Sequence, residues 1–81
     1  MSSDYGNRRR TRMDIKVAER IAELMRDEGI NQVQLASKIG VKQNTVSSWV
    51  LGKKEPNISS LWRLADYFEV DIDYLVGRKL Y

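Results

Sequence analysis

The stretch NQVQLASKIGVKQNTVSSWVLG, residues 31–52, decides the fold. Apolar residues recur in it at helical spacing in two short runs, namely Leu35, Ala36 and Ile39, and then Val46, Trp49 and Val50. Asn31 can cap the first helix, and Gly40 can adopt the left-handed conformation that ends it. The second helix begins two residues later and closes at Gly52. Two short helices joined by so tight a turn are typical of a helix-turn-helix.

Three further helices are predicted around this pair. The first runs from a cap at Asp14 to Gly29, the fourth begins after a cap at Asn57, and the fifth runs from a cap at Asp71 to Gly77. Their apolar positions are Val17, Ile21 and Leu24; Ile58, Leu61, Ala65 and Phe68; and Ile72, Leu75 and Val76. No stretch alternates with period two, so the predicted fold class is all-α. We expect a compact five-helix domain whose second and third helices form the helix-turn-helix.

The 81 residues are enough for one small domain, which we place at residues 13–81. Residues 1–12 have no apolar periodicity and are predicted to be a flexible basic arm. The arm is either a segment that contacts a partner or a leader that is not native. Its basic residues are Arg8, Arg9, Arg10 and Arg12.

The charge of the domain is unevenly distributed. Residues 29–54 contain four lysines and no acid, whereas acids outnumber bases in residues 13–28 and 55–81. Such polarity usually directs one face of a protein toward a polyanion. The alternative is a lysine-rich face that is simply solvated.

The composition argues against an enzyme. Without histidine or cysteine the chain lacks the usual general base, thiolate zinc ligands and a disulfide framework, so we expect no catalytic residue, metal or cofactor. Asp71 and Asp73 resemble a carboxylate pair, but acids at a helix start have cap and dipole roles. No apolar run approaches membrane-spanning length and no signal peptide is evident, so a cytoplasmic location is expected.

The polar face of the second helix of the predicted helix-turn-helix is unusual. Four of its side chains are short or medium hydrogen-bonding groups, with Thr45 at the edge of the face: Gln43, Asn44, Ser47 and Ser48. Charged residues would favour the helix more strongly on a merely solvated face. Amide side chains can bond bidentately to adenine in the major groove, and hydroxyls can bond base edges or phosphates.

The chain resembles the phage repressor and Cro type of helix-turn-helix, also called the xenobiotic-response-element type, over residues 14 to about 78. The motifs that carry the resemblance are Gln32, Leu-Ala-x-x-x-Gly-Val at 35–41, Trp49, Gly-Lys-Lys at 52–54 before Pro56, and Asp-Tyr-Leu-x-Gly-Arg at 73–78. The resemblance implies sequence-specific binding of double-stranded DNA. It also implies a homodimer on a pseudo-palindromic operator and a role in transcription regulation, here expected to be repression.

By position, the resemblance implies base contacts by Gln43, Asn44, Ser47 and Ser48. It implies phosphate or backbone contacts by Gln32, Lys42, Thr45, Lys53 and Lys54, and Gln32 is further expected to hold Gln43 in place. The arm, with its arginines, is not part of the family pattern.

Other positions also depart from the pattern. Met25 and Val50 replace a common Arg–Glu pair, and we expect Val50 to be buried because an apolar pair can replace a buried ion pair. Leu51 either lies under the Lys53–Lys54 loop or faces a partner. Trp62 is predicted to pack in the core, with a dimer contact as the alternative. A protein-interaction module, such as an antitoxin, remains the alternative function; it would use the fourth helix and Leu51.

Overall fold

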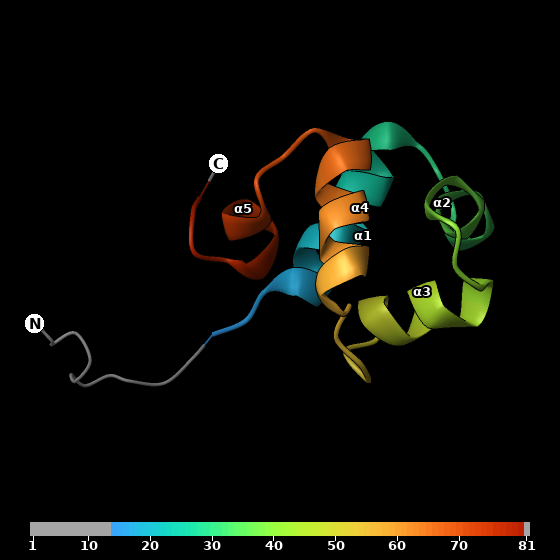
Figure 1. The fold of residues 1–81 in the computed structure, drawn as a ribbon, viewed down its shortest axis with the longest axis horizontal. Helices are drawn as coiled ribbons and strands as arrows, with labels where there is room; N and C mark the ends of the chain where they lie inside the picture. The colour runs from blue at the N-terminus through green and yellow to red at the C-terminus, as the bar shows by residue number, and fades with distance from the viewer. Residues whose placement is uncertain (1–13, 81) are drawn as a thin grey trace, which may run out of the picture.

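The computed structural model describes residues 14–80, and this part of the chain contains five helices and no strand (Figure 1). The helices are α1 (Val17–Glu28), α2 (Gln32–Ile39), α3 (Gln43–Val50), α4 (Ile58–Phe68) and α5 (Ile72–Val76). The all-α prediction is therefore confirmed. The arm residues Arg8, Arg9, Arg10 and Arg12 lie outside the described residues. None of the five helices is both long enough and apolar enough to cross a membrane.

The helix-turn-helix lies at one end of the molecule. In Figure 1, α2 and α3 lie to one side of α1 and α4, and α5 lies to the other. Helix α1 packs against α3 and α5, whereas α4 packs against α2 and α5. Because α2 and α3 also pack against each other, α1 and α2 hold α3 at the edge of the domain.

Each helix contributes one apolar side chain that is completely removed from solvent. These side chains are Ile21, Leu35, Val46, Leu64 and Leu75. Burial of a side chain of this size stabilises the fold by about 1.5–3 kcal/mol. Trp49 and Met25 complete the same core beside α3. The predicted apolar positions include four of these five side chains; in α4 they include the buried Phe68 but not Leu64.

The turn between α2 and α3 has the predicted chemistry. Asn31 Oδ1 accepts a hydrogen bond from the Gln34 amide, and Gln34 Oε1 accepts one from the Asn31 amide, both at 2.8 Å. Gly40 has φ of 78°, and its amide and that of Val41 both donate to the Ala36 carbonyl. The cap at Asn57 is also confirmed, since its side chain accepts from the Ser60 amide at 2.9 Å.

Of the two predicted acidic caps, Asp14 is wrong, and Asp71 is right in position but makes no side-chain bond to the helix. Helix α1 is preceded by Lys16 without a side-chain cap, and the Asp14 carboxylate instead lies 3.0 Å from Lys16 Nζ. Asp71 occupies the cap position of α5, but its side chain binds the ammonium of Lys79 rather than a helix amide. These carboxylates raise the pKa of Lys16 and of Lys79, chiefly through the hydrogen bond to each ammonium. A lysine close in space thus displaced the helix amides as the acid's partner.

The predicted core positions on α4 are partly wrong. Ile58 is 81% exposed and Trp62 is 69% exposed. Helix α4 buries the face that carries Leu64 and Phe68, and Trp62 lies two residues from Leu64, on nearly the opposite side. Nor is Leu51 covered by the loop that follows α3, because it is 64% exposed. Val50, expected to be buried, is half-buried against the core.

A buried arginine ties the end of the described chain to α1. Arg20 is only 9% exposed, and its Nη1 donates to the carbonyls of Tyr74 and Lys79 at 3.1 and 3.2 Å. Its guanidinium also lies over the Tyr74 ring, 4.3 Å from the centroid. The Lys16 amide donates to the Val76 carbonyl at 3.1 Å. Together these contacts fix α5 and residues 77–80 on α1.

Candidate nucleic-acid interface

The first turns of α2 and α3 are joined by a hydrogen bond between two glutamines. Gln43 Nε2 donates to Gln32 Oε1 at 2.9 Å. Gln32 is the first residue of α2, and the Asn31 cap fixes the start of that helix, so the backbone of Gln32 has a fixed position. The bond confirms the expectation that Gln32 holds Gln43 in place. The Gln43 side chain remains exposed and keeps a carbonyl oxygen and a second amide hydrogen for another partner.

Helix α3 presents the polar side chains of the predicted face. Gln43 and Asn44 are exposed in its first turn, whereas Thr45, Ser47 and Ser48 are half-buried. Val46 and Trp49 are buried and hold the opposite side of the helix in the core. The sequence prediction of which side faces outward is therefore confirmed.

The loop after α3 is folded back on the helix end. The amides of Lys53 and Lys54 both donate to the Ser48 carbonyl, at 2.9 and 3.3 Å. This contact places two exposed lysines beside the C-terminal turn of α3. Lys42, at the other end of α3, is exposed as well. Cationic side chains thus lie at both ends of the exposed polar face.

A shallow hollow of about 280 Å³ separates α3 from the start of α4. It is lined by Asn44, Thr45, Ser48, Trp49, Lys54, Glu55, Asn57 and Ser60. The sequence interpretation did not assign Asn57 or Ser60 to the site. The cap signal at Asn57 marks the start of α4. The return of the loop onto Ser48, which brings α4 to this face, is a tertiary contact that the local sequence does not reveal.

A third residue that the sequence interpretation missed is Arg63. Its Nη1 donates to the Ile39 carbonyl, the last of α2, at 3.2 Å. The contact joins α4 to the helix-turn-helix directly beside Gly40. Because an arginine on a helix surface has no sequence signature for such a contact, only the structure identifies it.

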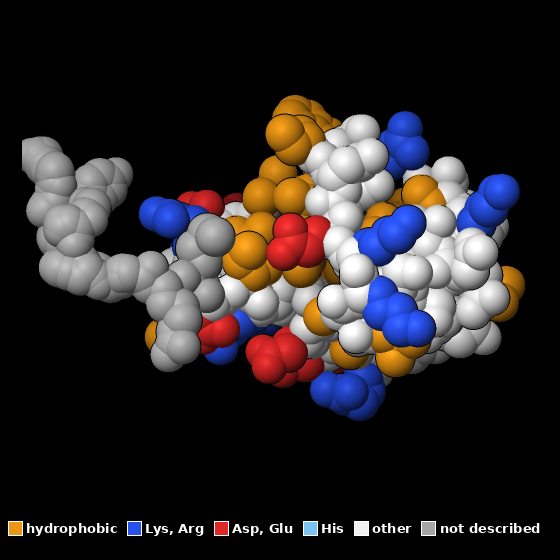
Figure 2. Space-filling model, turned by 90° about the horizontal axis from the view of Figure 1, so that it is seen from below, with side chains coloured by type: hydrophobic (Ala, Val, Ile, Leu, Met, Phe, Trp, Pro, Cys, Tyr) orange, Lys and Arg blue, Asp and Glu red, His pale blue; other side chains and the backbone are white. Residues whose placement is uncertain are grey.

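The charges of the surface follow the same division. Figure 2 views the molecule from the α3 side; the charged side chains on its right-hand part are Lys and Arg, whereas Asp and Glu lie over the middle and left, with further Lys and Arg beside them. This agrees with the absence of acids from residues 29–54. A face with polar groups at its centre and cations around it suits a phosphate-bearing ligand. Within residues 14–80, no group of three or more acidic side chains could hold a metal ion.

Known proteins share this sequence pattern and fold. A family model described as helix-turn-helix matches residues 21–75. The transcriptional activator BcrR of Enterococcus faecalis is 34% identical over 59 residues, which are 73% of this chain and 29% of that protein. The cryptic phage CTXphi transcriptional repressor RstR of Vibrio cholerae is 31% identical over 64 residues, or 79% of this chain and 57% of that protein. The chain therefore spans less than two thirds of the length of either relative.

Solved structures give the same result. A transcriptional regulator from Listeria innocua has a TM-score of 0.76 and 35% identity, over 80% of this chain and 61% of that one. The P22 c2 repressor, solved in complex with a synthetic operator, has a TM-score of 0.73 and 28% identity. That match covers 85% of this chain and all of the other. Since the family model matches well over half of the residues, the chain belongs to the Cro/C1-type helix-turn-helix family.

Proposed function

We propose that the chain is a sequence-specific, double-stranded DNA-binding transcriptional regulator, and that it acts as a repressor in the cytoplasm without enzymatic activity. The observation that carries the proposal is the exposed α3 face, where Gln43 is held by Gln32 and exposed lysines lie at both ends of the helix. The relatives include both a transcriptional activator and a transcriptional repressor. Repression is the simpler mechanism, because a small domain on an operator can block a promoter by occupancy alone.

In this proposal α3 enters the major groove and divides its contacts between bases and backbone. Base edges are contacted by Gln43, Asn44, Ser47 and Ser48. Phosphates and sugars are contacted by Gln32, Lys42, Thr45, Lys53 and Lys54. The backbone contacts set the register of the protein on the duplex, and the base contacts supply the discrimination. Arg8, Arg9, Arg10 and Arg12, in the predicted arm, would add contacts to the backbone or the minor groove.

We propose further that two copies bind a pseudo-palindrome through the exposed face of α4. Trp62 protrudes between two shallow hollows, one lined by Ile58, Ser59 and Arg63, the other by Ala65, Asp66, Val70 and Ile72. In a dimer with two-fold symmetry, the N-terminal end of the exposed α4 face would lie against the C-terminal end of the same face in the partner copy. Antiparallel packing would then place each Trp62 in a hollow and bring Arg63 of one copy near Asp66 of the other.

The experiment that tests the proposal is selection of bound duplexes from a random DNA library at near-physiological salt. We expect an inverted repeat with half-sites about 34 Å apart, one turn of DNA. A parallel selection with a chain that begins at Met13 measures what the arm adds. Weak, salt-sensitive binding without any enriched motif would contradict the proposal.

Substitutions test the assignment of base contacts. Gln43→Ala or Asn44→Ala should lower affinity for the selected site by about 1–3 kcal/mol and relax preference at one base pair. Ser37→Ala, an exposed residue of α2 outside the assigned set, is the control. An equal loss on every duplex would remove these residues from base recognition.

Trp62→Ala tests the α4 contact. It should reduce the cooperativity of binding to the full inverted repeat while leaving affinity for a single half-site unchanged. Leu80→Ala, at another exposed apolar residue, is the control.

A second candidate function, an antitoxin-like module that binds another protein, is favoured by the same exposed Ile58 and Trp62. Stoichiometric co-purification of a different protein that Trp62→Ala abolishes would establish that alternative.

A further inference from the structure

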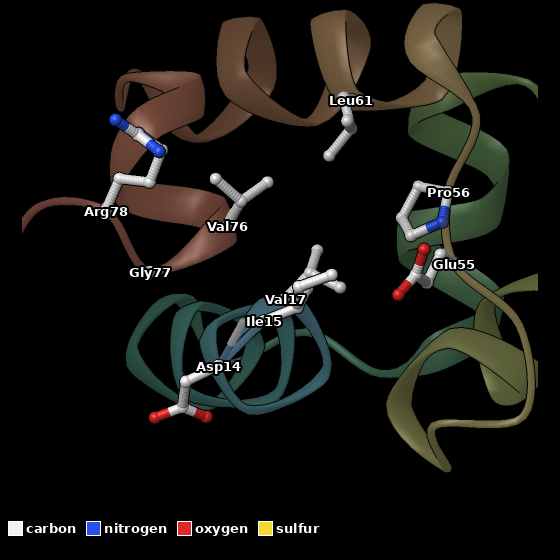
Figure 3. A pocket seen from close by; sticks show the side chains of 9 residues that line it. All are labelled: Asp14, Ile15, Val17, Glu55, Pro56, Leu61, Val76, Gly77 and Arg78. Carbon is white, nitrogen blue, oxygen red and sulfur yellow. The ribbon is translucent and has the colours of Figure 1, made fainter. Parts of the chain in front are cut away.

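An apolar hollow of the described chain lies at the N-terminal ends of α1 and α4. It has a volume of about 490 Å³ and is bounded by the residues that precede α1, the loop before α4, α4 itself and the end of α5. Figure 3 shows five apolar side chains directed toward the same space: Ile15, Val17, Pro56, Leu61 and Val76. A volume of this size, with mostly apolar walls, lies within the range of small-molecule sites in proteins.

Helix packing explains why this space is open. Helix α1 is held by α3 and α5, and α4 is held by α2 and α5. The N-terminal ends of α1 and α4 therefore lie across the hollow from each other. The hydrogen bond from the Lys16 amide to the Val76 carbonyl closes one side of it. A Cβ on Gly77 would come within 3.0 Å of Lys16 Cβ, so this side has little room to move.

One charged group on the rim faces the space. The Glu55 carboxylate points into the hollow, whereas the Asp14 carboxylate and the Arg78 guanidinium point away from it (Figure 3). Asp14 is already paired with Lys16. Glu55, in contrast, has no hydrogen bond or ion pair within residues 14–80. The site therefore combines an apolar floor with one uncompensated negative charge.

We propose that this hollow binds a small apolar molecule that carries a single cationic amine. The apolar body would contact Leu61, Val76 and Ile15, and the ammonium would pair with Glu55. An anion would be repelled by the same carboxylate, and a neutral molecule would leave it without a partner. This site is distinct from the α3 face, and ligand binding to it does not depend on the proposed DNA function.

Binding there should also affect DNA affinity, a consequence that does rest on the proposed function. Glu55 follows Lys53 and Lys54 directly and also lines the hollow beside α3. Its negative charge repels nearby phosphates, and a bound ammonium would cancel that repulsion. By linkage, DNA would then strengthen binding of the amine by the same factor.

The test uses three probes with one apolar body: 4-phenylbutylamine, 4-phenylbutanol and 4-phenylbutanoate. Binding to the full chain without DNA is followed by NMR titration of backbone amides. The amine should shift the amides of residues 14–17, 55, 57–61 and 76–78. It should bind about two- to fivefold more tightly than the alcohol, as expected for one exposed ion pair, and the acid should bind most weakly. Equal affinity of amine and alcohol, or shifts elsewhere, would overturn the proposal.

Two substitutions sharpen the test. Glu55→Gln should remove the preference for the amine over the alcohol, whereas Glu23→Gln, at an exposed acid of α1, should keep it. Ile15→Trp should fill the hollow from its open edge and weaken all three probes. Ile15 is 46% exposed, so the substitution should leave the fold intact, and thermal unfolding checks this. Undiminished binding to Ile15→Trp would place the probes at another site.

The coupling to DNA is measured with the selected operator at low salt. Saturating 4-phenylbutylamine should tighten DNA binding by about two- to threefold, and Glu55→Gln should give the same gain and abolish the effect of the amine. An unchanged affinity would refute the coupling. If the chain bound no DNA at all, the proposed function would fail, while the titration without DNA would still decide whether the hollow is a ligand site.

Discussion

Gln43 donates its side-chain amide to Gln32 across the turn between α2 and α3, at 2.9 Å. A long side chain at the start of a helix is thereby restricted to one orientation before any ligand binds. Preorganisation of this kind reduces the ordering cost of a bidentate contact. In the proposed complex Gln32 therefore has two roles: it contacts the DNA backbone, and it contributes to base recognition by orienting Gln43.

A double-mutant cycle tests this relationship. Gln32→Met should weaken binding to the preferred site by about 1 kcal/mol, because Gln43 loses its partner. In a background that already carries Gln43→Ala, the same change should cost less, because only the contact of Gln32 itself with the DNA backbone remains to be lost. Equal costs in the two backgrounds, measured by titration of a labelled duplex, would show that Gln32 acts independently of Gln43.

The lysines of the loop should act on the backbone alone. Lys53→Ala should weaken binding to specific and non-specific duplexes alike and reduce the slope of log K against log salt by about 0.9. Lys38→Ala is the matched control, an exposed lysine of α2 outside the assigned contacts. A salt slope that stays the same in Lys53→Ala would exclude a phosphate contact by Lys53.

Arg20 should contribute more to stability than any surface arginine. Arg20→Met removes two hydrogen bonds from a buried cation and its contact with the Tyr74 ring. We expect a loss of about 2 kcal/mol in the free energy of unfolding, measured by urea denaturation. Arg26→Met, at an exposed position on the same helix, should change stability by less than about 0.5 kcal/mol. Similar values for the two variants would contradict a structural role for Arg20.

The Lys79–Asp71 pair predicts a stability change at high pH. The pKa of Lys79 is raised above its ordinary value of 10.5, so the folded state holds this proton more tightly than the unfolded state does. Its contribution is fully present below pH 10.5 and is lost as the pH rises through the raised pKa. The difference in Tm between the chain and Lys79→Gln should therefore be constant up to pH 10.5 and shrink above it. A difference that persists at the highest pH would show that the charge of Lys79 is not its source.

The sequence was sufficient for the helices and most of the core, because glycines and capping asparagines mark the helix ends and apolar spacing marks one face of each helix. It failed where spacing leaves two interpretations. Ile58 and Trp62 carry the apolar signal of a core, but the core of α4 uses Leu64 together with the predicted Phe68 and leaves Ile58 and Trp62 exposed. For Arg20 the error is the opposite, because a charged residue is buried. The carbonyls that accept its hydrogen bonds lie more than fifty residues away in the sequence.

The candidate site was predicted in outline for a similar reason. A polar face without acids is visible in residues 40–54, and so is the identity of the glutamine expected to hold Gln43. The hollow beside α4 and the contact of Arg63 with Ile39 depend on how the loop returns, which no local pattern encodes.

Helix α3 has eight residues and no side-chain cap at Lys42. Helices shorter than roughly 12–15 residues are marginal in water on their own. The order of α3 must then come from the packing of Val46 and Trp49 beneath it. The segment would not keep its shape as a synthetic peptide or when grafted onto an unrelated scaffold. A substitution that loosens the core should therefore disturb the shape of α3, and with it the proposed DNA recognition, before it unfolds the whole domain.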